Sequence, residues 1–198
     1  TSQEIFMKEF NALYNGQKIN SLNLQYKDFS IWQNNLLKNG IFRDQEQFWI
    51  EKFKNGIPDC NIFADYSTSK TYRFIGKQIV FYISDDVRKK IKNLLEKVEV
   101  TPFILYLSVL NILLAKYTTK EDIVIGTPVA GRTHIDFSNM IGLFVNTVVQ
   151  RNYPTGNKAF IQFLKEVKNN TYESIENQDY PFEKLIEAIF NSSLSLTP

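Results

Sequence analysis

The run from Phe103 to Tyr117 constrains the fold more than any other part of the sequence, because it is apolar on nearly every side of a helix. Thr101 and Pro102 stand just before it and predict a helix start, as a capping residue followed by a first-turn proline. A helix without a polar face has to be surrounded by other elements. We therefore expect a central, buried helix around which the rest of the chain packs.

The remaining periodicity predicts an α/β fold with more helices than strands. Helical patterns cover residues 1–15, 26–39, 44–54, 84–98, 158–176 and 181–190. Runs rich in β-branched and aromatic residues predict strands at 72–83, 122–126 and 143–151. Three or four strands make a small sheet that helices cover on one face, whereas its other face and its edges need a partner. We expect a two-layer α/β sandwich that ends in a frayed polar tail at residues 191–198.

Charge and composition exclude several classes of function. The formal net charge is +2 and the basic residues are spread among acidic ones, so nucleic-acid binding is not indicated. The apolar runs are too short to span a bilayer, and no secretion signal opens the chain. A single cysteine, Cys60, allows no internal disulfide, which fits a cytoplasmic protein. The absence of an initiator Met leads us to expect a piece excised from a longer protein.

Four segments carry residue types that are common in binding or catalytic sites, namely residues 26–32, 126–134, 141–151 and 177–183. The aromatic first segment also fits a helix start that packs two rings into a core. The second superficially matches a phosphate-binding loop with Arg132 in the lysine position. We reject that interpretation because arginine does not replace the compact ammonium group and no helix begins at Thr133. A tight turn is the favoured use of these glycines.

Individual polar residues in these segments leave alternatives open. Asn146 sits in an otherwise apolar strand, so its amide either satisfies broken backbone next to it or faces a solvated cavity. Gly142 would let another group approach the backbone closely. Asp179 and Glu183 suit the capping of a short final helix. His134 is the only histidine, and a single histidine forms neither a metal cluster nor a Ser/His/Asp triad.

Together the four segments resemble the motif series of the condensation domains of nonribosomal peptide synthetases. Residues 26–32 resemble the motif Y-x-D-F-A-x-W, with Ser30 in place of alanine, and residues 126–134 resemble G-x-P-x-A-G-R-x-H. Residues 141–151 resemble G-x-F-V-N-T…R, and residues 177–183 resemble (H/N)-Q-D-Y-P-F-E. The segments follow the order and about the spacing of that family.

The resemblance implies one lobe of a chloramphenicol acetyltransferase-like fold, in which two lobes form a V around a tunnel. Residues 1–198 would be the C-terminal lobe, and residues 1–25 a linker helix that comes from the N-terminal lobe. In this family an amine on an acceptor carrier protein attacks a thioester on a donor carrier protein, and an amide forms. Phosphopantetheine arrives on those carrier proteins, so no bound cofactor is expected. The implied partners are the N-terminal lobe, both carrier proteins and an adjacent adenylation domain, in secondary metabolism such as antibiotic biosynthesis.

The resemblance also implies roles for particular residues. The tunnel wall would be formed by Asn146, Gly142, Phe144, Thr147, Gly131, Arg132 and His134. A structural role would belong to Tyr26, Asp28, Phe29, Trp32, Arg151, Gln178, Asp179, Tyr180, Pro181, Phe182 and Glu183. No metal ligand is expected. The family's H-H-x-x-x-D-G motif, which supplies the histidine that handles the amine, matches nothing in this chain, so we expect no catalytic residue in it.

Three hypotheses about function follow from this comparison of motifs. The first is a lobe of an amide-forming enzyme that is inactive alone. The second is a non-catalytic module that docks a carrier protein or pairs with an N-terminal lobe. The third and weakest is a stand-alone acyltransferase with His134 as its base. An isolated lobe would also expose an apolar face, through which we expect a dimer to form.

Overall fold

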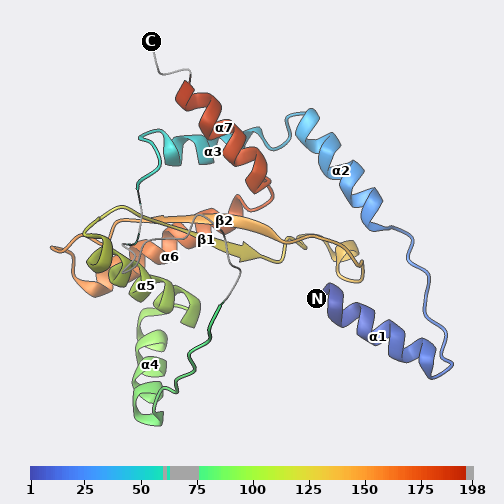
Figure 1. The fold of residues 1–198 in the computed structure, drawn as a ribbon, viewed down its shortest axis with the longest axis horizontal. Helices are drawn as coiled ribbons and strands as arrows, with labels where there is room; N and C mark the ends of the chain where they lie inside the picture. Colours follow the sequence, from blue (N-terminus) through green and yellow to red (C-terminus); the bar gives the residue numbers. More distant parts are fainter. Residues whose placement is uncertain (60–61, 63–75, 195–198) are drawn as a thin grey trace. The chain divides into compact units, whose positions relative to one another are not determined.

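The computed structural model describes residues 1–59, 62 and 76–194 of the chain. These residues fall into two units, which are described separately below. The first unit comprises Thr1–Ile57, Gly126–Val149 and Ser174–Pro198, and the second comprises Pro58–Ile125 and Gln150–Glu173. Helices predominate over a small sheet (Figure 1), so the predicted α/β class is confirmed.

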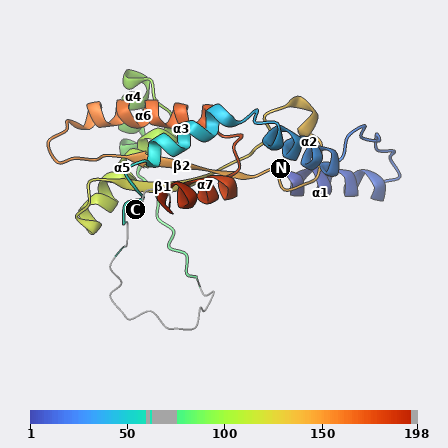
Figure 2. The same cartoon turned by 90° about the horizontal axis from the view of Figure 1, so that it is seen from above.

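The helices of the first unit are α1 (Ser2–Tyr14), α2 (Tyr26–Lys38), α3 (Arg43–Phe53) and α7 (Phe182–Leu194). All four agree with predicted helices. The carboxylate of Asp28 caps α2 by accepting a hydrogen bond of 2.8 Å from the backbone N–H of Gln25. The α3 and α7 helices lie side by side (Figures 1 and 2), and each turns buried apolar side chains inward. Because α7 is helical through Leu194, the predicted frayed tail is wrong for residues 191–194, and residues 195–198 lie outside the described part.

The second unit is built on α4 (Asp85–Val98), α5 (Pro102–Thr118) and most of α6 (Phe160–Glu176). The predicted capping residues are confirmed, because the Ser84 hydroxyl accepts the Val87 N–H at 3.5 Å and the Thr101 hydroxyl accepts the Ile104 N–H at 3.3 Å. The core joins the buried side of α5 to α6, and it comprises Val100, Ile104, Leu105, Leu107, Phe163, Leu164 and Val167.

The α5 helix is buried on one side only, which corrects the expectation of all-round burial. Its opposite side carries a stripe of exposed apolar residues at helical spacing, which we call the α5 stripe: Phe103, Tyr106, Leu110, Leu113 and Tyr117. Within the described residues of the second unit, the core gathers on the other side of the helix. The composition of a helix does not reveal on how many sides it packs against other elements.

The sheet consists of β1 (Ile123–Val129) and β2 (Asn146–Asn152). Gly126 lies against Thr147 and Gly131 lies against Phe144, so the two chain segments run in opposite directions. The loop between them contains the short 3₁₀ helix η1 (Ile135–Phe137). The β2 strand begins three residues later than residue 143, the predicted start.

The predicted strand at 72–83 is not formed over residues 76–83, the part of it that the structure describes. Residues 76–83 adopt no regular structure, and Ile79 and Phe81 are 87% and 80% exposed, while residues 72–75 lie outside the described part. The sheet therefore has two strands among the described residues, rather than the expected three or four. A strand is stabilised by cross-strand pairing, so β propensity alone does not form one.

Candidate functional site

The first three motif segments meet in the first unit around a cluster of aromatic rings. Phe29 of α2 lies 4.6 Å from Phe144 and 5.0 Å from Phe137, measured between ring centroids. Tyr26 meets Phe144 edge-on at 5.2 Å. Phe29 is buried, whereas Trp32 is about half exposed at the edge of the cluster. The aromatic segment therefore packs rings into a core, as its structural interpretation predicted.

Gly142 is needed because the backbone is approached closely there. A Cβ atom at this position would lie 2.2 Å from the Tyr26 ring. The hydroxyl of Ser2 donates to the Gly142 carbonyl at 2.8 Å and accepts its N–H at 3.2 Å. The expected close approach is confirmed, and the groups that make it are Tyr26 and Ser2 of this chain. Figure 2 shows α1 and α2 beside the loop between β1 and β2.

Gly131 lies at a second close approach. Its φ of +63° is in the left-handed region, and an added Cβ would lie 1.7 Å from the carbonyl oxygen of Phe144. The predicted tight turn is therefore present and depends on glycine. It aims the following residue, Arg132, back over the aromatic cluster.

Arg132 holds the loop to its surroundings. Its guanidinium lies 4.2 Å from the centroid of the Phe144 ring, donates to Ser2 Oγ at 2.9 Å and donates to the Phe137 carbonyl. Burial lowers the pKa of the Arg132 guanidinium below its ordinary value. The group stays protonated at neutral pH and acts as a planar donor.

The His134 side chain forms a hydrogen bond within its own loop. Its Nδ1 atom accepts a hydrogen bond of 3.3 Å from the Asp136 N–H, which caps η1, and its side chain is 61% exposed. The imidazole also forms one side of a groove of about 320 Å³, whose lining is Leu24, Asp28, Phe29, Trp32, His134, Asp136, Phe137 and Met140.

Asn146 makes four hydrogen bonds, which decides between the two alternatives left open by the sequence. Its Nδ2 donates to the carbonyls of Gln178 at 2.7 Å and Tyr180 at 2.9 Å. Its Oδ1 accepts from the N–H groups of Thr147 at 2.9 Å and Phe182 at 3.1 Å. The amide therefore satisfies neighbouring backbone and joins β2 to the turn that precedes α7.

Three residues of α3 hold the same turn from another side, and the sequence analysis missed all of them. Gln45 Oε1 accepts the Tyr180 N–H at 2.9 Å, and Trp49 Nε1 donates to the Asn177 carbonyl at 3.0 Å. The Tyr180 hydroxyl donates to Glu46 Oε1 at 2.9 Å. The available signal was that Gln45 and Trp49 stand at i and i+4 of one helix and so share a face.

Both burial and nearby carboxylates shift the pKa of the Tyr180 phenol. Burial raises the pKa of the Tyr180 phenol well above its ordinary value, and the hydrogen bond and the charge of Glu46 raise it further. The phenol therefore stays protonated over the physiological range and is a permanent donor to Glu46.

Members of all four motif segments line one small hollow of about 30 Å³, enough for about one water molecule. Its lining is Phe29, Trp32, Gln33, Phe42, Gly131, Thr133, Phe144, Asn146, Gln178 and Asp179. The fold thus brings together residues from segments up to 150 positions apart that were predicted to act together.

A protein-family model described as the condensation domain matches residues 1–193 of the chain. The chain belongs to the condensation domain family. Tyrocidine synthase 3 of Brevibacillus parabrevis is 41% identical over 188 residues, which are 95% of this chain and 3% of that synthase. Bacitracin synthase 1 of Bacillus licheniformis is 39% identical over 188 residues, which are 95% of this chain and 4% of that synthase. This condensation domain chain therefore spans a small fraction of the length of these curated relatives.

Solved structures agree on the fold. The condensation domain from the Monacolin K polyketide synthase MokA superposes with a TM-score of 0.76 at 22% identity, over 94% of this chain and 44% of that one. A four-domain nonribosomal peptide synthetase bound to AMP and glycine superposes with a TM-score of 0.68 at 30% identity, over 73% of this chain and 11% of that one. This condensation domain chain has the α/β, chloramphenicol acetyltransferase-like fold expected from the resemblance.

Arg151, the last residue of the 141–151 motif segment of this condensation domain chain, lies in the second unit. It forms a bidentate ion pair with Asp122, with distances of 3.0 Å and 2.6 Å, and its side chain is 6% exposed. The pair ties the end of β2 to the residue just before β1. Asp122 was missed by the sequence analysis, because its partner is 29 positions away.

Among the described residues of this condensation domain chain, no group of three or more His, Cys, Asp or Glu side chains could hold a metal ion. No single described helix has the length and apolar character to cross a membrane, although the bent pair α4 and α5 meets that test on length and composition alone.

Proposed function

We propose that this chain forms one lobe of a domain that makes amide bonds during nonribosomal peptide synthesis. The reaction would join an amine on an acceptor carrier protein to an acyl group held as a thioester on a donor carrier protein. The amine nitrogen would form the new bond to the carbonyl carbon, and the thiol of the donor arm would leave. The observation that carries the proposal is the convergence of members of all four motif segments on the hollow beside Asn146.

The substrates and partners follow from that reaction. Both acyl and amino substrates would arrive on phosphopantetheine arms of carrier proteins, so the chain itself would bind no cofactor. An N-terminal lobe would supply the opposite wall of the tunnel, and an adenylation domain would lie next to the condensation domain in the same synthetase. We propose a cytoplasmic location for that synthetase.

We propose that this lobe positions the reaction without supplying its base. The wall would comprise Gly131, Arg132, His134, Gly142, Phe144, Asn146 and Thr147. In this role Asn146 would act as a positioning residue, because its amide holds the turn at residues 178–182 instead of pointing freely at a substrate. The histidine motif of the family matches nothing in the chain, which leaves no base for the amine.

The test is to purify the chain and offer it both loaded carrier proteins. We expect no condensation above the uncatalysed rate, and activity on adding an N-terminal lobe of a matching condensation domain. Condensation at a normal rate by the isolated chain would refute the proposed division of roles. The variant His134→Ala, in the reconstituted pair, tests the third hypothesis, since it should retain activity if His134 is not a base.

The exposed face of α1 favours a second candidate, a lobe-pairing or docking module without chemistry. No residue of α1 is buried, and its exposed apolar side chains include Phe6, Phe10, Leu13 and Tyr14. Such a face is suited to covering by another protein surface. A pull-down with carrier proteins and with an N-terminal lobe would discriminate, because binding without restored activity favours this candidate. Self-association through this face would appear as a dimer in sedimentation.

A further inference from the structure

The α3 helix belongs to none of the four motif segments, yet it borders the hollow that those segments share. Phe42, the residue just before α3, is buried and lines that hollow. Gln178 and Asp179, in the turn before α7, line it as well. Trp49 of α3 holds the start of the same turn by donating to the Asn177 carbonyl at 3.0 Å. The α3 helix therefore contacts the hollow at its first residue and the turn along its first two turns.

Tyr180 is the residue through which α3 reaches the Asn146 amide. The Tyr180 phenol donates to Glu46 Oε1 at 2.9 Å, and its backbone N–H donates to Gln45 Oε1 at 2.9 Å. The carbonyl of the same residue accepts from Asn146 Nδ2 at 2.9 Å. Two side chains of α3 and one of β2 thus bind different atoms of a single residue. A shift of Tyr180 away from α3 would carry with it the carbonyl that orients Asn146.

The part that Glu46 plays in this network is that of a hydrogen-bond acceptor. The phenol remains protonated at neutral pH and donates its only proton to the Glu46 carboxylate. An amide oxygen at this position can accept the same bond, whereas a methyl group cannot. Glutamine and alanine substitutions therefore separate the effect of the bond from that of the charge.

We propose that Glu46, assisted by Gln45, is a positioning residue for condensation, because it fixes the turn at residues 177–181 and, through Tyr180, the Asn146 amide beside the hollow. Neither α3 side chain would touch a substrate. Without the Glu46 bond the wall would occupy several arrangements, and a reaction that depends on alignment is slowed by small displacements. The catalytic part of this inference rests on the proposed function, whereas the mechanical part does not.

The first measurement uses the chain itself and needs no activity. Asn146 Oδ1 accepts the Phe182 N–H at 3.1 Å, so hydrogen–deuterium exchange of this amide reports on how firmly Asn146 is held. We expect Glu46→Ala to speed that exchange about five- to thirtyfold, the effect of losing one such bond. Glu46→Gln should keep the rate within about twofold of the natural chain. An unchanged Phe182 rate in Glu46→Ala would overturn the proposal.

A double-variant cycle shows whether Glu46 acts through the phenol. Tyr180→Phe removes the same hydrogen bond from its other end. Combining it with Glu46→Ala should therefore speed exchange of the Phe182 amide little beyond either single variant. Two effects that multiply in full would show that Glu46 acts by another route, and the positioning relay would be wrong.

The second measurement uses a complete condensation domain and both loaded carrier proteins. We expect Glu46→Ala to lower kcat about ten- to hundredfold and to change the KM for each carrier protein less than about twofold. Glu46→Gln should restore most of kcat. Rates are expressed per folded molecule, with the folded fraction taken from circular dichroism. A residue that only stabilises the fold would lower the folded fraction and leave this kcat unchanged.

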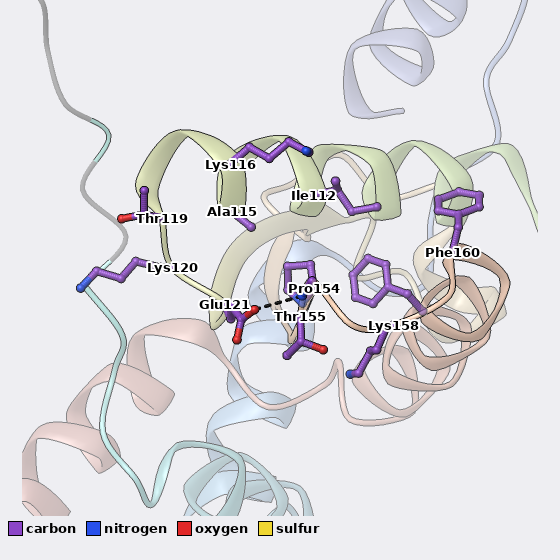
Figure 3. A pocket seen from close by; sticks show the side chains of 12 residues that line it. Ile112, Ala115, Lys116, Thr119, Lys120, Glu121, Pro154, Thr155, Lys158 and Phe160 are labelled. Atoms are coloured by element: carbon purple, nitrogen blue, oxygen red, sulfur yellow. Dashed lines mark hydrogen bonds between the residues drawn. The ribbon is translucent and has the colours of Figure 1, made fainter.

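Glu166→Ala is the matched control, in the second unit. Glu166 accepts a bond of 2.6 Å from Lys158, which lines a cavity of about 410 Å³ (Figure 3). No residue of the four motif segments lines that cavity. Both glutamates are partly buried and both accept from a distant side chain. We expect Glu166→Ala to leave kcat and the Phe182 exchange rate within about twofold of the natural values.

The two measurements separate this inference from the proposed function. If the natural complete domain forms no amide, the proposed function fails, while the exchange rates still decide whether Glu46 holds Asn146. If the natural domain is active and Glu46→Ala keeps its kcat per folded molecule, the positioning role in catalysis is refuted. Equal losses in Glu46→Gln and Glu46→Ala would refute the role of Glu46 as a hydrogen-bond acceptor.

Discussion

The Tyr180 phenol donates a hydrogen bond of 2.9 Å to Glu46, and so joins the turn before α7 to α3. The partners are 134 positions apart in the sequence. The same turn is held by Asn146 from β2, so two independent elements position it. Any tunnel wall that includes this turn depends on both attachments.

Removing the phenol tests the first attachment. Tyr180→Phe should lower the free energy of unfolding by about 1–2 kcal/mol, because Glu46 then loses a donor while the ring packing remains. Glu46→Gln is the matched control, since an amide oxygen still accepts the hydrogen bond. Urea unfolding measures both variants, and an unchanged midpoint for Tyr180→Phe would contradict a stabilising role for the bond.

Stability at alkaline pH follows from the pKa of the same phenol. The folded-state pKa of Tyr180 lies above its ordinary value of about 10, so the unfolded chain releases this proton first. The contribution is therefore complete below about pH 10 and is lost as the pH rises further. Thermal unfolding between about pH 9 and 11 should show a steeper loss of stability for the natural chain than for Tyr180→Phe. Parallel curves for the two proteins would count against the raised pKa.

Replacing Asn146 tests the second attachment. Asn146→Ala leaves the carbonyls of Gln178 and Tyr180 without their donor and should cost about 1–3 kcal/mol of stability. Asn146→Asp keeps both acceptor functions but places a carboxylate against those carbonyls, so it should cost at least as much. In a complete condensation domain that stays folded, Asn146→Ala should also slow condensation. An unaltered rate and an unaltered unfolding midpoint would remove Asn146 from both roles.

Gly142 tests the close approach of α2 to the loop. Gly142→Ala should destabilise the chain by about 1–3 kcal/mol, because the new methyl group would lie 2.2 Å from the Tyr26 ring. Gly156→Ala is the matched control, since nothing lies within 4 Å of the position of its added Cβ. The Tyr26→Ala variant should tolerate the added methyl with a smaller further loss. Full additivity of the two substitutions would show that the ring is not the obstacle.

The buried ion pair gives a test in the second unit. Arg151→Met removes the bidentate ion pair with Asp122 and should cost about 3–5 kcal/mol, because a partly buried carboxylate loses the two charge-assisted bonds of that pair. Arg151→Lys keeps the charge but not the bidentate geometry, so its stability should lie between that of the natural chain and that of Arg151→Met. A surface pair such as Arg88 with Asp85 is the control, and Arg88→Met should cost less than about 1 kcal/mol.

The sequence alone determined the features that depend on neighbours a few residues apart. Ser84, Thr101 and Pro102 act within one helical turn, and they correctly placed the starts of α4 and α5. The order of the four motif segments was likewise sufficient to indicate the family.

Only the tertiary structure decided features that need a distant partner. Residues 76–83 have strong β propensity but pair with no strand among the described residues, and α5 is apolar all round but packed on one side. The hydrogen-bond partners of the Asn146 amide include carbonyls more than 30 positions away. Glu46 likewise accepts its hydrogen bond from the distant Tyr180 phenol. Helix capping and hydrophobic periodicity depend on residues close together in the sequence. Burial and long-range hydrogen bonds depend instead on which surfaces meet in the folded chain.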